Sequence, residues 1–304
     1  MTPFLSVNRF AFVTLALLAA STGCGGGGGG DGGTGTLTLS VTDAPVDGAS
    51  AVVVEFTGVE LKPAGGERVV FDFDSPRQID LLALQGGAST PLLDGVEVPA
   101  GDYNWIRLAV NAELDVLDSY VELGGGARIS LFIPSGAETG LKLHSGFTVA
   151  QGGIADFTID FDLRKSVHDP VGQPDFHLRP SLRLVDNLEV GSVSGTVSSE
   201  LVTDAGCTNG INHDMGNAVY IYAGAGATVD DVGSANEPLA SAIVSLDPDT
   251  QEYRYEIGFV AAGSYTVAFT CQAADDDPVT DDAITFVGAA DIGVTAGFDT
   301  IHDF

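Results

Sequence analysis

The chain has 304 residues, with 42 Asp and Glu against 12 Lys and Arg, so its formal net charge is −30 at pH 7. We exclude nucleic acid as a partner, because a phosphate backbone needs basic side chains, and flat electrostatic binding to anionic lipid is disfavoured for the same reason. The charge permits divalent cations, basic partners or a salty habitat in which acidic surfaces stay hydrated. The length allows one large domain or two ordinary ones, and the apolar content of 44% is ample for a core.

The N-terminal residues are typical of an exported protein. Arg9 is the only charged residue among the first 30, and the apolar run at 10–20 has the length of a signal peptide but is too short to span a bilayer. Small residues then precede Cys24, and the whole pattern resembles a bacterial lipoprotein signal. The resemblance implies that residues 1–23 are removed and that Cys24 is lipidated. An ordinary cut after a small residue stays open, because Ser21 stands where lipoproteins usually carry leucine.

Residues 24–35 form a Gly-rich tether behind this cysteine. Such a chain behaves as a random coil with a reach of roughly 20 Å. We therefore expect the lipid bilayer to be contacted through the lipidated Cys24. Gly25 in place of Asp implies, by the same resemblance, sorting to the outer membrane, with the body on its periplasmic or cell-surface face.

The rest of the chain is predicted to be all-β. Short runs of apolar and polar alternation are separated by Gly, Pro, Asp and Asn, and no stretch shows a capped helical period. The clearest alternation is 155–163, where the Phe, Ile and Leu residues share one face and the Asp residues share the other. The expected strands are 36–42, 51–61, 68–73, 78–84, 103–110, 128–133, 147–150, 155–163 and 176–186, then 192–198, 217–222, 241–246, 253–259, 264–270, 283–287 and 291–296. Their grouping predicts two β-sandwich domains, 36–187 and a smaller one at 190–304.

Several motifs in the first domain resemble a known family. They include Leu39-Ser-Val-Thr-Asp-Ala-Pro45, Asp160-Phe-Asp-Leu-Arg-Lys-Ser166 and Leu178-Arg-Pro-Ser-Leu-Arg183. Over about 35–187 the chain resembles a bacterial lipoprotein domain catalogued as domain of unknown function 4382, which brings no known activity, cofactor or catalytic residue. Residues 190–304 resemble the carboxypeptidase-regulatory, transthyretin-like sandwich through Gly191–Val197 and Phe259–Phe269. That resemblance implies a spacer, stalk or binding module.

The three cysteines divide into one anchor and one pair. With Cys24 assigned to lipid, Cys207 and Cys271 remain as an even pair in an oxidising compartment, and we predict a disulfide between them. Two buried free thiols are the alternative.

Acidic side chains offer candidate calcium sites. Asp160 and Asp162 lie about 7 Å apart on one strand face, and Asp43 in a nearby turn could share an ion with them. The plainer interpretations are a polar face paired with basic side chains, and an Asp that makes a turn. The acidic run 274–282 lacks the pattern of an EF-hand loop and is predicted to be a solvated loop, with adventitious Ca²⁺ as the alternative. We expect no cofactor apart from Ca²⁺.

We find no nucleophile elbow and no phosphate-binding loop, so we expect no enzyme. The sequence favours a membrane-anchored, non-catalytic module for binding, display or envelope structure. The alternative is a carbohydrate-binding or adhesin module, in which Tyr220, Tyr222, Tyr253 and Tyr255 would present an aromatic face to a glycan. Its partner would be a glycan or an envelope protein. An unrecognised hydrolase is a third, weaker interpretation.

Overall fold

The computed structural model describes residues 33–44, 49–133, 140–168, 170, 174–179, 181–207 and 216–304. The predicted signal peptide, Cys24 and most of the tether lie outside these residues. The chain forms two units, 1–31 and 32–304, and every element below belongs to the second. Within the described ranges, none of the helices combines the length and apolar character needed to cross a membrane.

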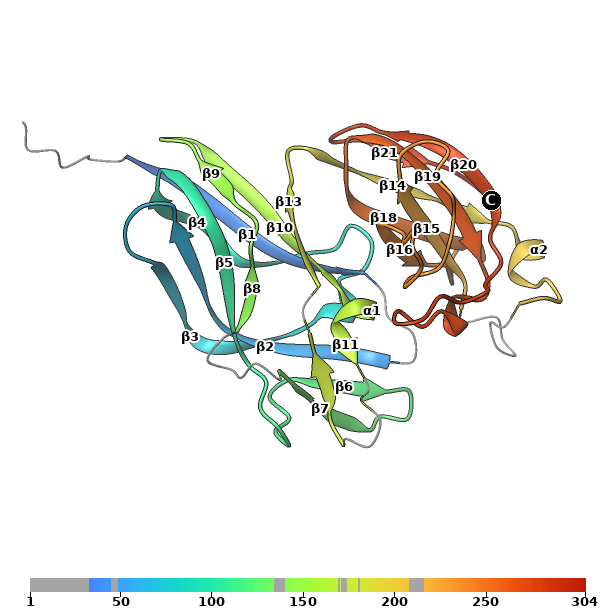
Figure 1. Cartoon of the computed structure of the whole chain (residues 1–304), viewed down its shortest axis with the longest axis horizontal. Coiled ribbons are helices and arrows are strands. Elements are labelled where there is room, and N and C mark those ends of the chain that lie inside the picture. Colours follow the sequence, from blue (N-terminus) through green and yellow to red (C-terminus); the bar gives the residue numbers. More distant parts are fainter. Residues whose placement is uncertain are drawn as a thin grey trace, which may run out of the picture. The chain divides into compact units, whose positions relative to one another are not determined.

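The described chain is all-β, as predicted, and forms four sheets (Figure 1). A four-stranded sheet has the order β13-β10-β1-β4 and consists of β1 (Thr34–Ala44), β4 (Thr90–Pro99), β10 (Ile154–Asp162) and β13 (Leu182–Asp186). A nine-stranded sheet has the order β11-β12-β7-β6-β2-β5-β8, with β3 on β2 and β9 on β5. Its strands are β2 (Ala49–Pro63), β3 (Val69–Asp80), β5 (Gly101–Asn111), β6 (Tyr120–Leu123), β7 (Arg128–Phe132), β8 (Leu141–Leu143), β9 (Phe147–Val149), β11 (Val167–His168) and β12 (Phe176–Leu178).

Two further sheets use the rest of the chain. One has the order β17-β18-β14-β21, with β14 (Val190–Val197), β17 (Ser245–Leu246), β18 (Tyr253–Ala261) and β21 (Asp299–Ile301). The other has the order β16-β15-β19-β20, with β15 (Ala218–Ala223), β16 (Ala240–Ile243), β19 (Gly263–Thr270) and β20 (Val287–Val294). Short helices are η1 (Leu81–Ala83), α1 (Leu163–Ser166), α2 (Ser199–Val202) and η2 (Ala273–Asp275). The expected strand at 283–287 is wrong, since β20 begins only at Val287.

The first two sheets enclose one apolar core, and β10 shows how the sequence builds it. Its Phe157, Ile159 and Phe161 point inward as the alternation predicts. β10 runs parallel to β1, in which Leu37, Leu39 and Val41 are fully buried. Phe161 meets Phe56 of β2 edge-to-face, with 6.3 Å between ring centroids. This contact crosses from one sheet to the other, which is the packing of a sandwich.

The last two sheets enclose an apolar core of their own. Val193 of β14 and Ile257 of β18 pack against Ile221 of β15 and Val267 of β19. The opposite face of β15 is covered as well, because Tyr220 and Tyr222 form a smaller buried cluster. We call residues 34–186 the N-terminal half and residues 190–304 the C-terminal half. Their predicted status as two domains stays a prediction.

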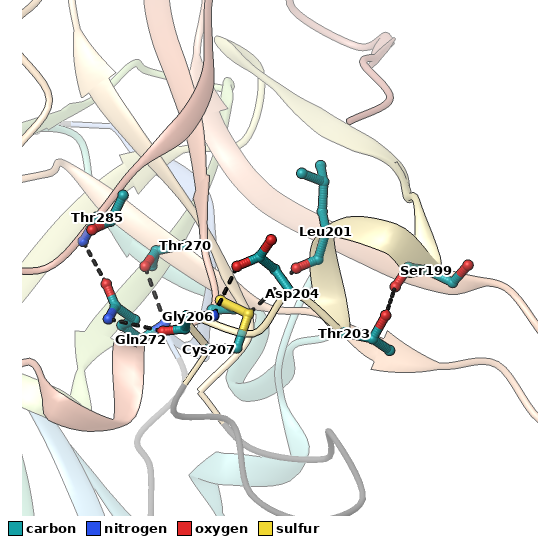
Figure 2. The surroundings of a disulfide bond; sticks show 10 residues. Ser199, Leu201, Thr203, Asp204, Gly206, Cys207, Thr270, Gln272 and Thr285 are labelled. Carbon is teal, nitrogen blue, oxygen red and sulfur yellow. Dashed lines mark hydrogen bonds between the residues drawn. A yellow bond between two sulfur atoms is a disulfide. The ribbon is translucent and has the colours of Figure 1, made fainter.

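The disulfide prediction is confirmed. Cys207, which follows α2, is bonded to Cys271, which follows β19, with 5.1 Å between their Cα atoms. Figure 2 shows the surroundings, where Gln272 donates from Nε2 to the carbonyl oxygen of Gly206 at 3.2 Å and accepts from the backbone of Thr285 at 2.7 Å. The bond therefore fastens the α2 segment to the end of the central strand β19.

Candidate functional site

The strand register places two of the predicted metal-site residues in one place. In the parallel pairing of β1 and β10, Thr42 lies opposite Asp160 and Asp43 lies opposite Phe161. Asp43 and Asp160 both line a cavity of about 560 Å³. This volume is in the range of about 300–1,000 Å³ that small-molecule sites occupy.

The cavity walls come from both halves. The N-terminal half contributes Thr42, Asp43, Gln85, Gly86, Asp160 and Arg183. The C-terminal half contributes residues from β14, β16 and β18, together with Ile301 and Asp303. The loop that carries Gln85 is held by Thr42, whose hydroxyl donates to the carbonyl oxygens of Leu84 at 3.0 Å and Ala88 at 2.6 Å. One end of β1 thus positions a wall of the cavity.

The lining is polar and carries both signs of charge. Arg183 of β13 donates to Asp160 at 2.6 Å, as their register on neighbouring strands allows. Burial raises the pKa of Asp160, and Arg183 opposes that rise. Asp303 accepts from the backbone N–H of Thr196 at 2.8 Å and from its hydroxyl at 2.9 Å, and these bonds lower the pKa of Asp303. The site can therefore offer charged and neutral hydrogen-bonding groups to a polar ligand.

One aromatic lining residue has an unusual backbone. Phe259 of β18 has φ 53°, in the left-handed region that non-glycine residues rarely occupy. It lines the cavity and belongs to none of the apolar cores formed by the described residues. A strained residue that packs in no core is a reason to look for a role in binding.

The third predicted calcium ligand has a different position. Asp162 caps α1, accepting from the backbone N–H of Lys165 at 3.2 Å, and it lies 4.0 Å from the Lys165 ammonium group. Among the described residues, Asp43, Asp160 and Asp162 do not form a cluster in which three ligand atoms lie within 4.8 Å of one another. Asp160 and Asp162 have basic partners, and calcium at these residues stays a prediction.

The prediction that four tyrosines form an exposed aromatic face is wrong, because three of them are buried and the fourth is partly buried. Tyr220 is 0% exposed, Tyr222 2% and Tyr255 4%, and Tyr253 is partly buried against a core. The alternation correctly put Tyr220 and Tyr222 on one face. That face, however, is covered by the segments that follow β15 and β19, so the two rings pack with Phe286. These tyrosines cannot form an open platform for a sugar.

A buried polar contact between the halves was not predicted. Arg164 of α1 donates to the hydroxyl of Tyr220 and lies 3.5 Å from the carboxylate of Asp276, to which the same hydroxyl donates. The Arg164 and Asp276 side chains are 6% and 0% exposed. Burial is the main cause of the raised pKa of both Tyr220 and Asp276. Arg164 belongs to the Asp160–Ser166 motif, but no local pattern shows which distant residues it reaches.

The family resemblance of the N-terminal half is supported by direct comparison. Residues 34–180 match the model of the family described as Domain of unknown function (DUF4382). No curated protein matches the chain.

Several solved structures are similar to this chain at low identity. The TIE protein of Bacillus anthracis is 10% identical, with 90% of this chain and 34% of that protein covered, at a TM-score of 0.19. The minor pilin of Streptococcus agalactiae is 8% identical, with 88% and 94% covered, at 0.20. The major pilin subunit of Bacillus cereus is 12% identical, with 89% and 99% covered, at 0.20. The chain thus spans about a third of the length of the TIE protein. TM-scores of this size do not establish a shared function.

Proposed function

We propose that this chain is an extracytoplasmic, lipid-anchored protein whose β-sandwich body binds a ligand without catalysing a reaction. The observation that carries the location is the disulfide between Cys207 and Cys271. Disulfides form and persist outside the reducing cytosol, so the bond agrees with an export signal before Cys24. Lipidated Cys24 is the contact with the bilayer, and Gly25 favours the outer membrane.

Metabolic labelling with an alkyne fatty acid tests the anchor. Wild-type protein should become labelled and fractionate with membranes, whereas Cys24→Ser should be unlabelled and released. A matched control is the Cys207→Ser/Cys271→Ser double variant, which should be labelled like wild type. Equal labelling of Cys24→Ser and wild type would contradict the proposal.

The cavity at Asp160 and Arg183 is the proposed binding site. Its volume suits a small polar ligand, and its walls supply carboxylates, guanidinium groups and hydroxyls. The described lining includes neither His nor Cys, and one of its carboxylates, Asp160, is paired with Arg183 at 2.6 Å. These features support binding over catalysis.

One observation favours the carbohydrate-binding alternative, with the glycan bound in this cavity instead of on the tyrosines. Phe259 brings an aromatic ring to a polar wall, and rings beside hydrogen-bonding groups suit the apolar faces and hydroxyls of sugars. A role in binding would explain why Phe259 keeps a strained backbone, with φ 53°.

Screening against a glycan array, with and without Ca²⁺, tests this alternative. Phe259→Gly should abolish a glycan signal while changing the free energy of unfolding by less than about 1 kcal/mol, because glycine relieves the left-handed strain. Val279→Ala, at an exposed position in another loop, is the control and should bind like wild type. An unchanged signal in Phe259→Gly, or no glycan signal from wild type, would remove the carbohydrate role.

A further inference from the structure

The strongest unexplained feature lies on the outer face of the β16-β15-β19-β20 sheet. Two loops cover that face, one between β15 and β16 and one after η2, and the second contributes Phe286 to the apolar cluster there. Val232 of the first loop packs with Tyr220 and Tyr222 in the small apolar cluster. The loops approach closely, since a Cβ on Gly233 would stand 2.4 Å from the carbonyl oxygen of Thr280.

Four other aspartates from these loops gather around Asp231. One carboxylate oxygen each from Asp230, Asp231 and Asp281 lie within 4.8 Å of one another, and the same holds for Asp231, Asp276 and Asp282. Asp231 is common to both triads. Like charges this close repel strongly in a partly buried setting, and Arg164 reaches only the Asp276 side of the group, at 3.5 Å.

A second observation points to a ligand at Asp231. The residue is 0% exposed, and its Oδ1 atom is buried without a hydrogen-bond partner among the described residues. Its other oxygen accepts from the backbone N–H of Asp282 at 2.8 Å. A buried carboxylate oxygen without a donor is costly, and buried charges are normally paired or coordinate a metal. The residue whose Oδ1 lacks a donor, Asp231, is the one shared by both triads.

We propose that Asp231 is the centre of a Ca²⁺ site formed by the loop after β15 and the loop after η2. The donors in both triads are all carboxylate oxygens, which hard cations prefer, whereas zinc favours nitrogen and sulfur ligands. Calcium accepts an irregular set of six to eight oxygens, while Mg²⁺ demands near-ideal octahedral geometry. The ion supplies positive charge at Asp231, beyond what Arg164 supplies at Asp276, and fastens the two loops to each other.

This site is separate from the polar cavity and from the predicted calcium residues Asp43, Asp160 and Asp162. The acidic run 274–282 has the sequence pattern of a solvated loop. Because this run packs against Asp231, its residues Asp276, Asp281 and Asp282 can act as ligands together with Asp231.

Calorimetric titration of the EGTA-stripped full chain with CaCl₂ tests the proposal, together with melting curves. Wild type should bind Ca²⁺ and melt at least about 5 °C higher at a concentration 100-fold above its Kd, with a smaller response to MgCl₂. Asp231→Asn keeps the side-chain shape and an acceptor for the Asp282 N–H, and it should weaken Ca²⁺ binding at least tenfold. Asp249→Asn, the same charge change at an exposed turn, should bind like wild type.

Asp281→Asn is the second variant, because its side chain is exposed and we expect its substitution to leave the fold intact. It should also weaken Ca²⁺ binding, so a folding failure of Asp231→Asn leaves the test decisive. No Ca²⁺ binding by wild type up to 10 mM (on the order of ten times the weakest extracellular sites) would overturn the proposal. Unchanged affinity in Asp281→Asn would overturn it as well.

Discussion

Removing the disulfide should destabilise the C-terminal half selectively. Cys207 and Cys271 are 64 residues apart, and the bond closes that loop. In the chain-entropy model a loop of this length costs the unfolded chain about 14 cal/mol/K, which is about 4 kcal/mol at 25 °C. The Cys207→Ser/Cys271→Ser variant should therefore lose about 4 kcal/mol in the free energy of unfolding. Both cysteines are only partly buried, so the serine hydroxyls add little further cost.

The chain carries a built-in reporter for this experiment. Its single Trp, Trp105, lies in β5 of the N-terminal half, so tryptophan fluorescence follows unfolding of that half, while far-UV circular dichroism follows both. Denaturant titration of wild type, the double variant and reduced wild type should give coincident shifts for the last two. In both samples the midpoint of the circular dichroism transition should shift to a lower denaturant concentration, whereas the midpoint of the Trp105 fluorescence transition should shift less.

Two outcomes would refute this reasoning. An unchanged midpoint in the double variant would mean that the bond does not constrain the unfolded chain as the loop length requires. An equal shift of both signals would mean that the halves unfold as one cooperative unit, which contradicts the predicted division into 36–187 and 190–304.

Two further predictions concern the cavity walls. Gly258→Val should destabilise the protein by about 1–3 kcal/mol, because a Cβ there would stand 2.2 Å from the carbonyl oxygen of Gly86, whereas Gly125→Val, in open space, should be neutral in the same melting assay. Asp303→Asn should lower stability at neutral pH, because hydrogen bonds from Thr196 lower the pKa of Asp303 below its ordinary 3.8. That contribution is present above pH 3.8 and is lost as the pH falls through the lowered pKa, so wild type and variant should converge in acid; a constant difference in acid melts would contradict the assignment.

The elements that could be predicted are those whose pattern is local. The alternation in 155–163 is the strand β10 almost residue for residue, because each side chain's face follows from its place in the pleat. The disulfide was predictable from cysteine parity and compartment, without any knowledge of the fold. In each case the physical cause lies within a few residues or in composition.

The exposure of the tyrosines shows where local patterns stop. Alternation puts Tyr220 and Tyr222 on the same face of β15, which the structure has, but whether a face is open depends on what the rest of the chain lays over it. Here Val232 and Phe286 come from loops that follow two different strands. The identity of those covering segments is not encoded in the strand itself.

The same limit applies to charge, and there it has a chemical consequence. In water, the carboxylates of an acidic run such as 274–282 repel one another only weakly, because each is hydrated and screened. Once Asp276 and Asp282 dock against Asp231, hydration is lost and repulsion grows. Arg164 offsets only the charge of Asp276, at 3.5 Å, so under the proposal Ca²⁺ compensates the charge that remains at Asp231. The polar cavity differs, because Arg183 on the neighbouring strand already compensates Asp160. Two groups of acidic residues that look alike in sequence therefore differ in their need for an ion, and the difference is set by which neighbour the fold supplies.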